Sequence, residues 1–180
     1  MQFHFVMSNH LHGIITNRKS IRLKGYDYSQ NGVYFITVCT HQRECMFGKI
    51  VDEKLDLNEC GRIVESCWNE IPMHFSNVEL DAYVVMPNHL HGIITIVGAG
   101  SSRPLIVFGR ENRAPTLGKI VAYFKYATTK HINELQKTGI RKCWQRNYYE
   151  HIIRSEQSLE KIREYICNNP YHWKDDELFV

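Results

Sequence analysis

Apolar and polar positions follow two different periods along the chain, and these periods predict its elements. Runs rich in β-branched and aromatic residues are typical of strands, and they occupy residues 33–40, 78–86, 89–96 and 144–154. Apolar residues recur at helical spacing in three further segments, residues 58–75, 116–135 and 159–168. Each of these helices begins at or after a residue suited to the N-cap, namely Asn58, Thr116 and Ser158. The order strand, helix, strand, strand, helix, strand, helix predicts an α+β fold with a ferredoxin-like or RRM-like antiparallel sheet, helices packed on it and an additional C-terminal helix.

The second and third of these strands are joined by Pro87-Asn88, which is a tight-turn signal. Proline presets φ at the first turn position, and asparagine tolerates the second. We therefore expect a hairpin whose two strands lie near the centre of the sheet. Because side chains alternate between the faces of a strand, His89 and His91 lie together on one face and Leu90 on the other. A single strand histidine is usually a packing residue, but two at this spacing favour a site for one divalent cation.

The last predicted helix carries a tyrosine and an amide on one face. Tyr165 and Asn169 are four residues apart, so they lie one turn apart on the same side of the helix, which must end near Pro170. If this side faces the sheet, the amide oxygen of Asn169 can complete a three-ligand site with the two histidines. Tyr165 alone is typical of a packing tyrosine, but in this combination it indicates a nucleophile beside a metal-bound phosphate.

Length and composition indicate one domain without a membrane span. The chain has 180 residues, of which 43% are hydrophobic and 23% charged, as in ordinary soluble globular proteins. No run approaches the ~18 apolar residues of a membrane span, and the first residues do not resemble a signal peptide. We therefore expect a cytoplasmic protein. The net charge of +3 permits a nucleic-acid partner without requiring one.

The six cysteines include no C-x-x-C pair, so reduced and mostly buried thiols are expected. A zinc site formed by Cys39, His41 and Cys45 is the alternative to ordinary packing at these positions.

Part of the hairpin sequence occurs twice in the chain. Residues 6–16 repeat residues 85–95 with Ser8 in place of Pro87. The first copy comes without a helix or a nucleophile, so we divide the chain into a partial, non-functional repeat at 1–17 and a functional domain at 18–180. At best the copy adds an edge strand, and otherwise we expect it to be poorly ordered. Residues 97–115 are rich in glycine, serine and proline, which predicts a long mobile loop.

Basic residues outside the hairpin are candidates for contact with DNA. Lysines of the second predicted helix form either a solvated helix face or a phosphate-binding surface, and the residue pattern favours neither. The candidate DNA-binding residues are Lys119, Lys125, Lys130, Arg146 and Arg154.

The chain resembles the single-tyrosine HUH transposases, in particular the REP-associated tyrosine transposases, at three motifs that occur in the order of that family. These are residues 87–92 (PNHLHG), residues 144–154 (WQRNYYEHIIR) and Tyr165 followed by Asn169-Pro170. The resemblance spans residues 18–173, which is nearly the whole chain. It implies a single-stranded DNA endonuclease and strand transferase, that is, a transposase.

The resemblance also implies a role for each site residue. His89 and His91 would hold a divalent cation, Mg²⁺ or Mn²⁺, that polarises the scissile phosphate. Tyr165 would attack this phosphate to give a 5′-phosphotyrosine linkage and a free 3′-OH, and Asn169 would be the third metal ligand. The implied partner is single-stranded DNA with a hairpin structure, bound by a monomer or a homodimer. A cytoplasmic protein of this kind would be nucleoid-associated when bound to DNA.

Two other functions fit parts of the pattern. A non-catalytic RRM-like nucleic-acid-binding protein would keep the basic and aromatic positions but could drop a ligand, whereas all four site residues are present here. A metal-dependent phosphoesterase of small molecules would use water as its nucleophile and would not need Tyr165. A denaturation-resistant protein–DNA adduct separates the transposase from both alternatives.

Overall fold

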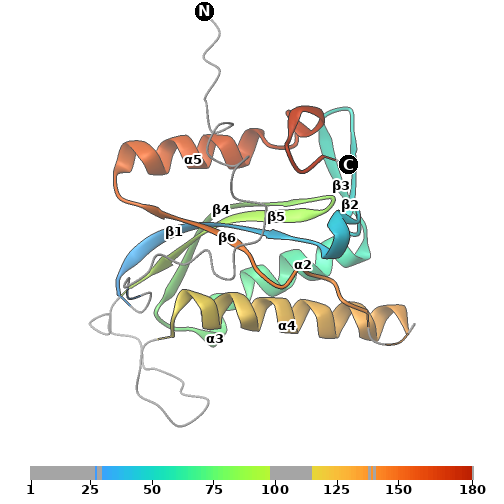
Figure 1. Cartoon of the computed structure of the whole chain (residues 1–180), viewed down its shortest axis with the longest axis horizontal. Helices are drawn as coiled ribbons and strands as arrows, with labels where there is room; N and C mark the ends of the chain where they lie inside the picture. The colour runs from blue at the N-terminus through green and yellow to red at the C-terminus, as the bar shows by residue number, and fades with distance from the viewer. Residues whose placement is uncertain (1–26, 28–29, 98–114, 138, 140, 180) are drawn as a thin grey trace, which may run out of the picture.

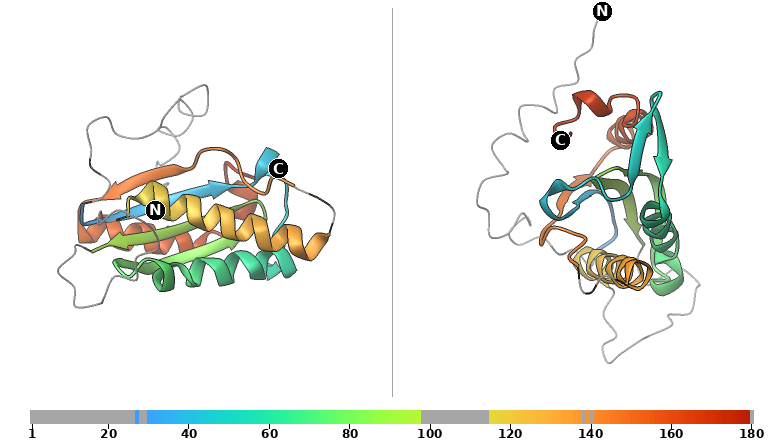
Figure 2. Two further views of the ribbon diagram at one scale, coloured as in Figure 1. Left: turned by 90° about the horizontal axis from the view of Figure 1, so that it is seen from below. Right: turned by 90° about the vertical axis from the view of Figure 1, so that its right-hand side faces the viewer.

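A four-stranded antiparallel sheet organises the protein (Figure 1). The computed structural model describes residues 27, 30–97, 115–137, 139 and 141–179. The strands lie in the spatial order β4 (Val78–Met86), β5 (His89–Ile96), β1 (Gly32–Cys39) and β6 (Tyr149–Ile153). One face of the sheet is covered by α2 (Glu59–Asn69), α3 (Ile71–His74) and α4 (Leu117–Gln136). The other face is covered by α5 (Glu156–Asn168), as the end-on view in Figure 2 shows.

The predicted α+β fold class is confirmed. Read across the sheet, the strands are the second, third, first and fourth of the four in chain order, and all neighbours are antiparallel, which is the ferredoxin-like arrangement. The prediction that both hairpin strands lie near the centre was wrong for one of them. β5 is an inner strand between β4 and β1, whereas β4 is an edge strand, because β1 bonds to both β5 and β6.

The sequence pattern missed a second, two-stranded sheet. It consists of β2 (Gly48–Val51) and β3 (Lys54–Leu57), which follow η1 (His41–Arg43). The turn between the two strands is formed by Asp52 and Glu53, which have left-handed φ values of 49° and 61°. Glycine or asparagine usually signals such a turn, and because neither is present here, the sequence did not reveal it.

Three element boundaries also differ from the prediction. The helix expected over residues 58–75 is divided at Glu70 into α2 and α3, because Pro72 cannot donate a backbone hydrogen bond in the first turn of α3. The N-cap of α5 is Ser155, whose side chain accepts from the N–H of Ser158, and not Ser158 itself. β6 begins only at Tyr149, whereas the predicted strand began at residue 144.

Some predictions concern parts of the chain outside the described residues. The partial repeat at 1–17 and residues 98–114 of the predicted loop belong to these parts. Within the described residues, no helix has both the length and the apolar character of a membrane span.

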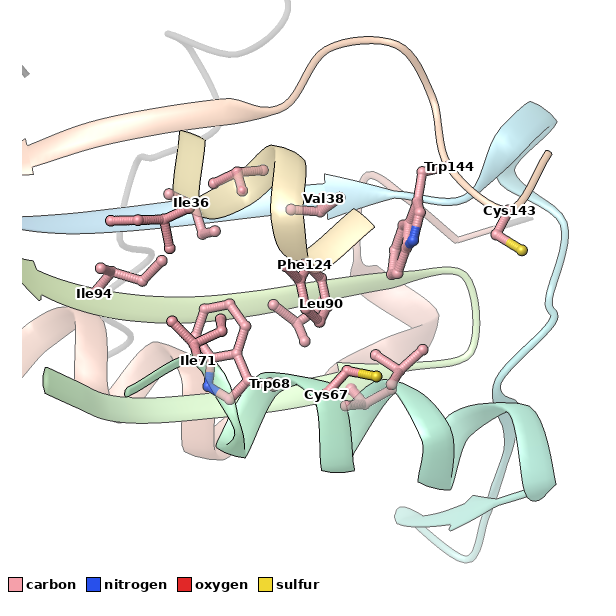
Figure 3. Close-up of a cluster of buried hydrophobic side chains, with 14 of the residues drawn as sticks. Ile36, Val38, Cys67, Trp68, Ile71, Leu90, Ile94, Phe124, Cys143 and Trp144 are labelled. Atoms are coloured by element: carbon pink, nitrogen blue, oxygen red, sulfur yellow. The ribbon is translucent and has the colours of Figure 1, made fainter. Parts of the chain in front are cut away.

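The larger core cluster lies between the sheet and helices α2 and α4 (Figure 3). Trp68 of α2 and Phe124 of α4 meet edge to face with their ring centroids 5.5 Å apart, and both are fully buried. Leu90 of β5 points into this cluster, so its neighbours His89 and His91 point to the opposite face, as the alternation predicted. A smaller cluster under α5 includes Phe35 and Ile166.

Gly92 should be sensitive to any added side chain. A Cβ at this position would lie 2.3 Å from Cζ2 of Trp68, which is buried and cannot move away freely. We expect Gly92→Ala to lower the free energy of unfolding by about 1–3 kcal/mol, the usual range for overpacking a core. Urea unfolding followed by circular dichroism measures this, and Trp68→Phe combined with Gly92→Ala should recover part of the loss. Unchanged stability in Gly92→Ala would show that the α2–β5 contact is looser than described.

Candidate active site

The hairpin turn places two buried histidines side by side on the α5 face of the sheet. β4 and β5 pair across the turn at Pro87-Asn88, with Met86 opposite His89. The imidazole rings of His89 and His91 have centroids 4.4 Å apart, and the residues are 0% and 3% exposed. The expected pairing of the two rings on one face is therefore present.

Each ring is held through its Nδ1 atom. The side-chain amide of Asn88 donates to the backbone carbonyls of Leu178 and Arg43 at 2.7 and 3.3 Å, which turns its Oδ1 toward His89 Nδ1 at 2.8 Å. Because that oxygen can only accept, Nδ1 of His89 carries the hydrogen and Nε2 keeps its lone pair. Nδ1 of His91 meets the hydroxyl of Thr37 at 2.8 Å, from the directly paired position on β1. Such contacts to the second ring nitrogen are typical of metal-binding histidines.

Both rings are neutral at neutral pH. Burial lowers the pKa of His91 to about 3. Burial, together with the nearby His91, also lowers the pKa of His89 well below its usual value of 6.5. A neutral imidazole offers a lone pair to a cation without first losing a proton.

The Tyr165 hydroxyl lies directly against this pair. It is 3.3 Å from Nε2 of His91, and its ring packs edge-on against Phe35, with the centroids 6.1 Å apart. Burial, with a contribution from the Asp176 carboxylate, raises the pKa of Tyr165, so the phenol is protonated at neutral pH. The residue as a whole is still 36% exposed, so part of its side chain is accessible from solvent.

An ion pair ties the helix that carries Tyr165 to the edge of the sheet. Nε and Nη2 of Arg163 donate to the carboxylate of Asp81 at 3.0 and 2.6 Å, a bidentate contact. Asp81 lies where the β4–β5 register shifts, between Leu80 and Tyr83. A β-bulge of this kind redirects a side chain, and here it aims Asp81 at α5.

Asn169 and Asp176 complete the cluster of polar side chains around the two histidines, and the sequence pattern did not reveal Asp176. One carboxylate oxygen of Asp176 and one nitrogen of each histidine lie within 4.8 Å of one another. Asn169 donates through Nδ2 to Asp176 Oδ2 at 3.1 Å, so its amide orients the carboxylate. Asp176 follows η2 (Trp173–Asp175) in an acidic run of residues 175–177, and no spacing rule relates this run to the hairpin.

Two acceptor atoms of the group are buried and have no hydrogen-bond partner among the described residues. They are Nε2 of His89 and Oδ1 of Asn169. Unpaired buried lone pairs are costly unless something binds them. Two neutral imidazoles, a carboxylate and an amide oxygen form a donor set that suits a divalent cation such as Mn²⁺ or Mg²⁺. The residues present therefore fit a metal site.

The alternative zinc site is not formed. Within the described part of the chain, His89, His91 and Asp176 are the only group of three or more histidine, cysteine or acidic residues arranged to hold a metal. Cys39, His41 and Cys45 do not form such a group.

The predicted DNA-binding residues are scattered. Lys119 and Lys130 are exposed on α4, which covers the face of the sheet opposite to the candidate site. Lys125 does not point outward, because its ammonium donates to the carbonyls of residues 145–147 at 2.5, 3.2 and 3.4 Å. Residues 145–147 are thus bound to α4 through Lys125, and β6 begins only after them. Arg146 and Arg154 are exposed at the two ends of β6.

Comparison with solved structures defines the class of fold. The structure of a REP-associated tyrosine transposase bound to a REP hairpin matches with a TM-score of 0.57 and 21% sequence identity, over 86% of this chain and 74% of that one. The chain thus has the fold of the REP-associated tyrosine transposases, which confirms at the level of the fold the resemblance found in the motifs. A putative transposase from Deinococcus radiodurans also matches, at 17% identity over 83% of this chain and 97% of that one, but its TM-score of 0.40 is too low to support an argument.

Comparison of sequences defines the family more narrowly. A protein of Haemophilus influenzae, itself uncharacterized, is 44% identical over 173 residues, which cover 92% of this chain and 95% of the relative. The chain belongs to the family of this protein. No family model matches the sequence.

Proposed function

We propose that the protein is a metal-dependent single-stranded DNA endonuclease and strand transferase, with Tyr165 as its nucleophile. The observation that carries the proposal is the 3.3 Å contact between the Tyr165 hydroxyl and Nε2 of His91, inside a group of donor atoms that suits a divalent cation. This hydrogen bond places the phenol oxygen next to a ring nitrogen of the pair that would hold the cation, which is where a nucleophile for a metal-bound phosphate has to lie. The transposase fold supports the same function.

In this proposal each residue has a defined task. His89 and His91 would hold the cation through Nε2, and Asp176 would add a charged oxygen ligand. Asn169 would orient Asp176 through Nδ2 and offer its buried Oδ1 as a further ligand. A bound Mn²⁺ or Mg²⁺ supplies Lewis-acid polarisation of the scissile phosphate. Each ring is kept in the required orientation by a hydrogen bond at its Nδ1 atom. Thr37 makes this bond to His91, and Asn88 makes it to His89.

The reaction that we propose is a phosphoryl transfer to the phenol. The Tyr165 oxygen forms a bond to phosphorus and the bond from phosphorus to the 3′ oxygen breaks, while the phenol loses its proton and the departing oxygen takes one up. The products are a 5′-phosphotyrosine and a free 3′-OH, so no oxidant or reductant is needed. Attack of another 3′-OH on the phosphotyrosine would reverse the bond exchange and join two strands.

The test is direct. Single-stranded oligonucleotides that contain a hairpin, labelled at the 3′ end, are incubated with the protein and Mn²⁺ and run on a denaturing gel. The 3′ label is required because the 3′ fragment stays attached to the tyrosine. We expect a labelled band at the mobility of the protein that disappears when EDTA replaces the metal. Cleavage without a covalent band would favour the water-based phosphoesterase, and hairpin binding without cleavage the RRM-like binder.

DNA outside the active site would contact exposed basic residues on the same side of the protein. Arg146 and Arg154 remain candidates, since both are exposed next to β6. Lys119 and Lys130 lie on the far face and could contact only a strand that wraps around the molecule. Lys125 is better explained as a structural residue that holds residues 145–147. The proposed partner is single-stranded DNA with a hairpin, and monomer and homodimer both remain compatible with the site.

The partial repeat at the N-terminus should not contribute a second site. Deleting residues 1–17, or changing His10 and His12 to alanine, should leave cleavage nearly unchanged and the metal content at about one ion per chain. The physical reason is that this copy lacks the proline of the turn and brings no nucleophile helix of its own. Cleavage assays and metal titration measure the two outcomes. Two bound ions in the intact chain, or a loss of activity on deletion, would show that the copy has a function.

A further inference from the structure

A cation from an unexpected segment lies at the edge of the candidate site. Arg43 ends η1, directly after β1, and Gln42 and Arg43 both have left-handed backbones, with φ of 56° and 58°. Consecutive left-handed residues other than glycine are disfavoured, and they persist where the surrounding structure fixes them, often at functional sites. Here the fixing contact is the hydrogen bond from Asn88 Nδ2 to the carbonyl of Arg43, from the same amide that orients His89.

The side chain of Arg43 reaches the other half of the group. Its Nη1 donates to the carbonyl of Glu177, the residue after Asp176, at 3.4 Å. This is a long bond at an exposed position, so it occupies little of the donor capacity of the guanidinium. The guanidinium therefore lies beside the segment that carries Asp176, while the backbone of Arg43 is bound by the amide that orients His89.

A phosphoryl transfer at this site needs such a charge. The scissile phosphate carries one negative charge, and negative charge builds up on its non-bridging oxygens as the phenol oxygen approaches. The planar fork of an arginine matches two of these oxygens. A preorganised cation aimed at developing charge is commonly worth 10²–10³-fold in rate.

We propose that Arg43 binds the non-bridging oxygens of the scissile phosphate and stabilises the charge that develops there during attack by Tyr165. This inference rests on the proposed function, because it assumes that a phosphodiester is bound beside His91. It assigns a substrate-binding role to the segment after β1, which none of the motifs includes.

The test compares a charged with a neutral linkage at the scissile position. Hairpin oligonucleotides carry there either the natural phosphate or a methylphosphonate, which lacks the negative charge. On the natural linkage, Arg43→Gln should slow adduct formation by about 10²-fold, the size expected for one lost electrostatic donor. On the methylphosphonate the same variant should differ from the parent by less than about 10-fold. Gln42 adopts the same left-handed backbone as its neighbour, so glutamine at position 43 adds no new backbone strain.

A binding measurement makes the test independent of the chemistry. In a Tyr165→Phe background, the parent should bind the phosphate-linked oligonucleotide more tightly than the methylphosphonate, and adding Arg43→Gln should remove that preference. Arg43→Lys, which keeps the charge but loses the fork, should fall in between. Arg62→Gln is the matched control, since Arg62 also donates to a backbone carbonyl but lies on α2.

The outcomes separate the inference from the proposed function. Equal losses on both linkages, or a charge preference that survives Arg43→Gln, would overturn the assignment of Arg43. The substitution would then act by disturbing the structure of the segment after β1 and not by removing a contact to the phosphate. A parent protein that forms no adduct with the natural linkage would overturn the proposed function instead. Thermal unfolding of each variant shows whether a loss comes from misfolding.

Discussion

Tyr165→Phe is expected to reduce covalent adduct formation with a hairpin oligonucleotide to below about one-thousandth of the wild-type level, because it removes the attacking atom itself. Hairpin affinity should stay within several-fold of wild type, since the substitution keeps the ring and its packing against Phe35. It deletes the contact from the hydroxyl to His91. Denaturing gels measure the adduct, and fluorescence anisotropy measures binding.

The most stringent control is another tyrosine near the site. Tyr149 lies on the same face of the sheet as Tyr165, and its ring meets Phe35 at a centroid distance of 6.3 Å. Tyr148 points to the opposite face and packs with the larger core. Tyr148→Phe and Tyr149→Phe should both keep adduct formation. An adduct that persists in Tyr165→Phe but is lost in Tyr149→Phe would move the nucleophile from α5 to β6.

His91→Ala should abolish cleavage at any accessible Mn²⁺ concentration while leaving hairpin binding within several-fold. The ring supplies a neutral nitrogen lone pair next to the Tyr165 hydroxyl, and no other histidine of the described chain lies with His89 and Asp176 in a metal-binding group. Hairpin affinity rests mainly on contacts to the phosphate backbone, so it should depend little on this ring. Calorimetric titration with Mn²⁺ measures the loss of metal binding.

Companion variants separate ligand loss from misfolding. His91→Leu keeps most of the volume of the buried side chain, offers no donor atom and should fail in the same way. Thr37→Val removes only the hydroxyl that contacts His91 Nδ1, and it should weaken metal binding by about 10–100-fold, the usual effect of losing such a support. His74→Ala is the control, since the ring of His74 packs at a tilt against Tyr123 on the far side of the sheet. Full cleavage by His91→Leu would end the metal hypothesis.

Several features of the site follow from local chain geometry, and the sequence alone determined these. The period of two along β5 places His89 and His91 together and sends Leu90 into the core. The helical period places Tyr165 and Asn169 on one side of α5. Pro87-Asn88 marks the turn, and the order of elements is enough to define the ferredoxin-like sheet. All of these depend on residues within a few positions of one another, or on element order.

Other features depend on which segments the fold brings together, and only the tertiary structure decided these. Thr37 reaches His91 because β1 and β5 are paired in one particular register. Asp176 and Arg43 reach the site from either end of the described domain, through contacts with Asn169, Asn88 and the backbone of Glu177. Lys125 looked like a surface cation but is bound by backbone carbonyls. Periodicity fixes the direction of a side chain relative to its own backbone, whereas contacts between distant segments depend on packing and register, which no local pattern encodes.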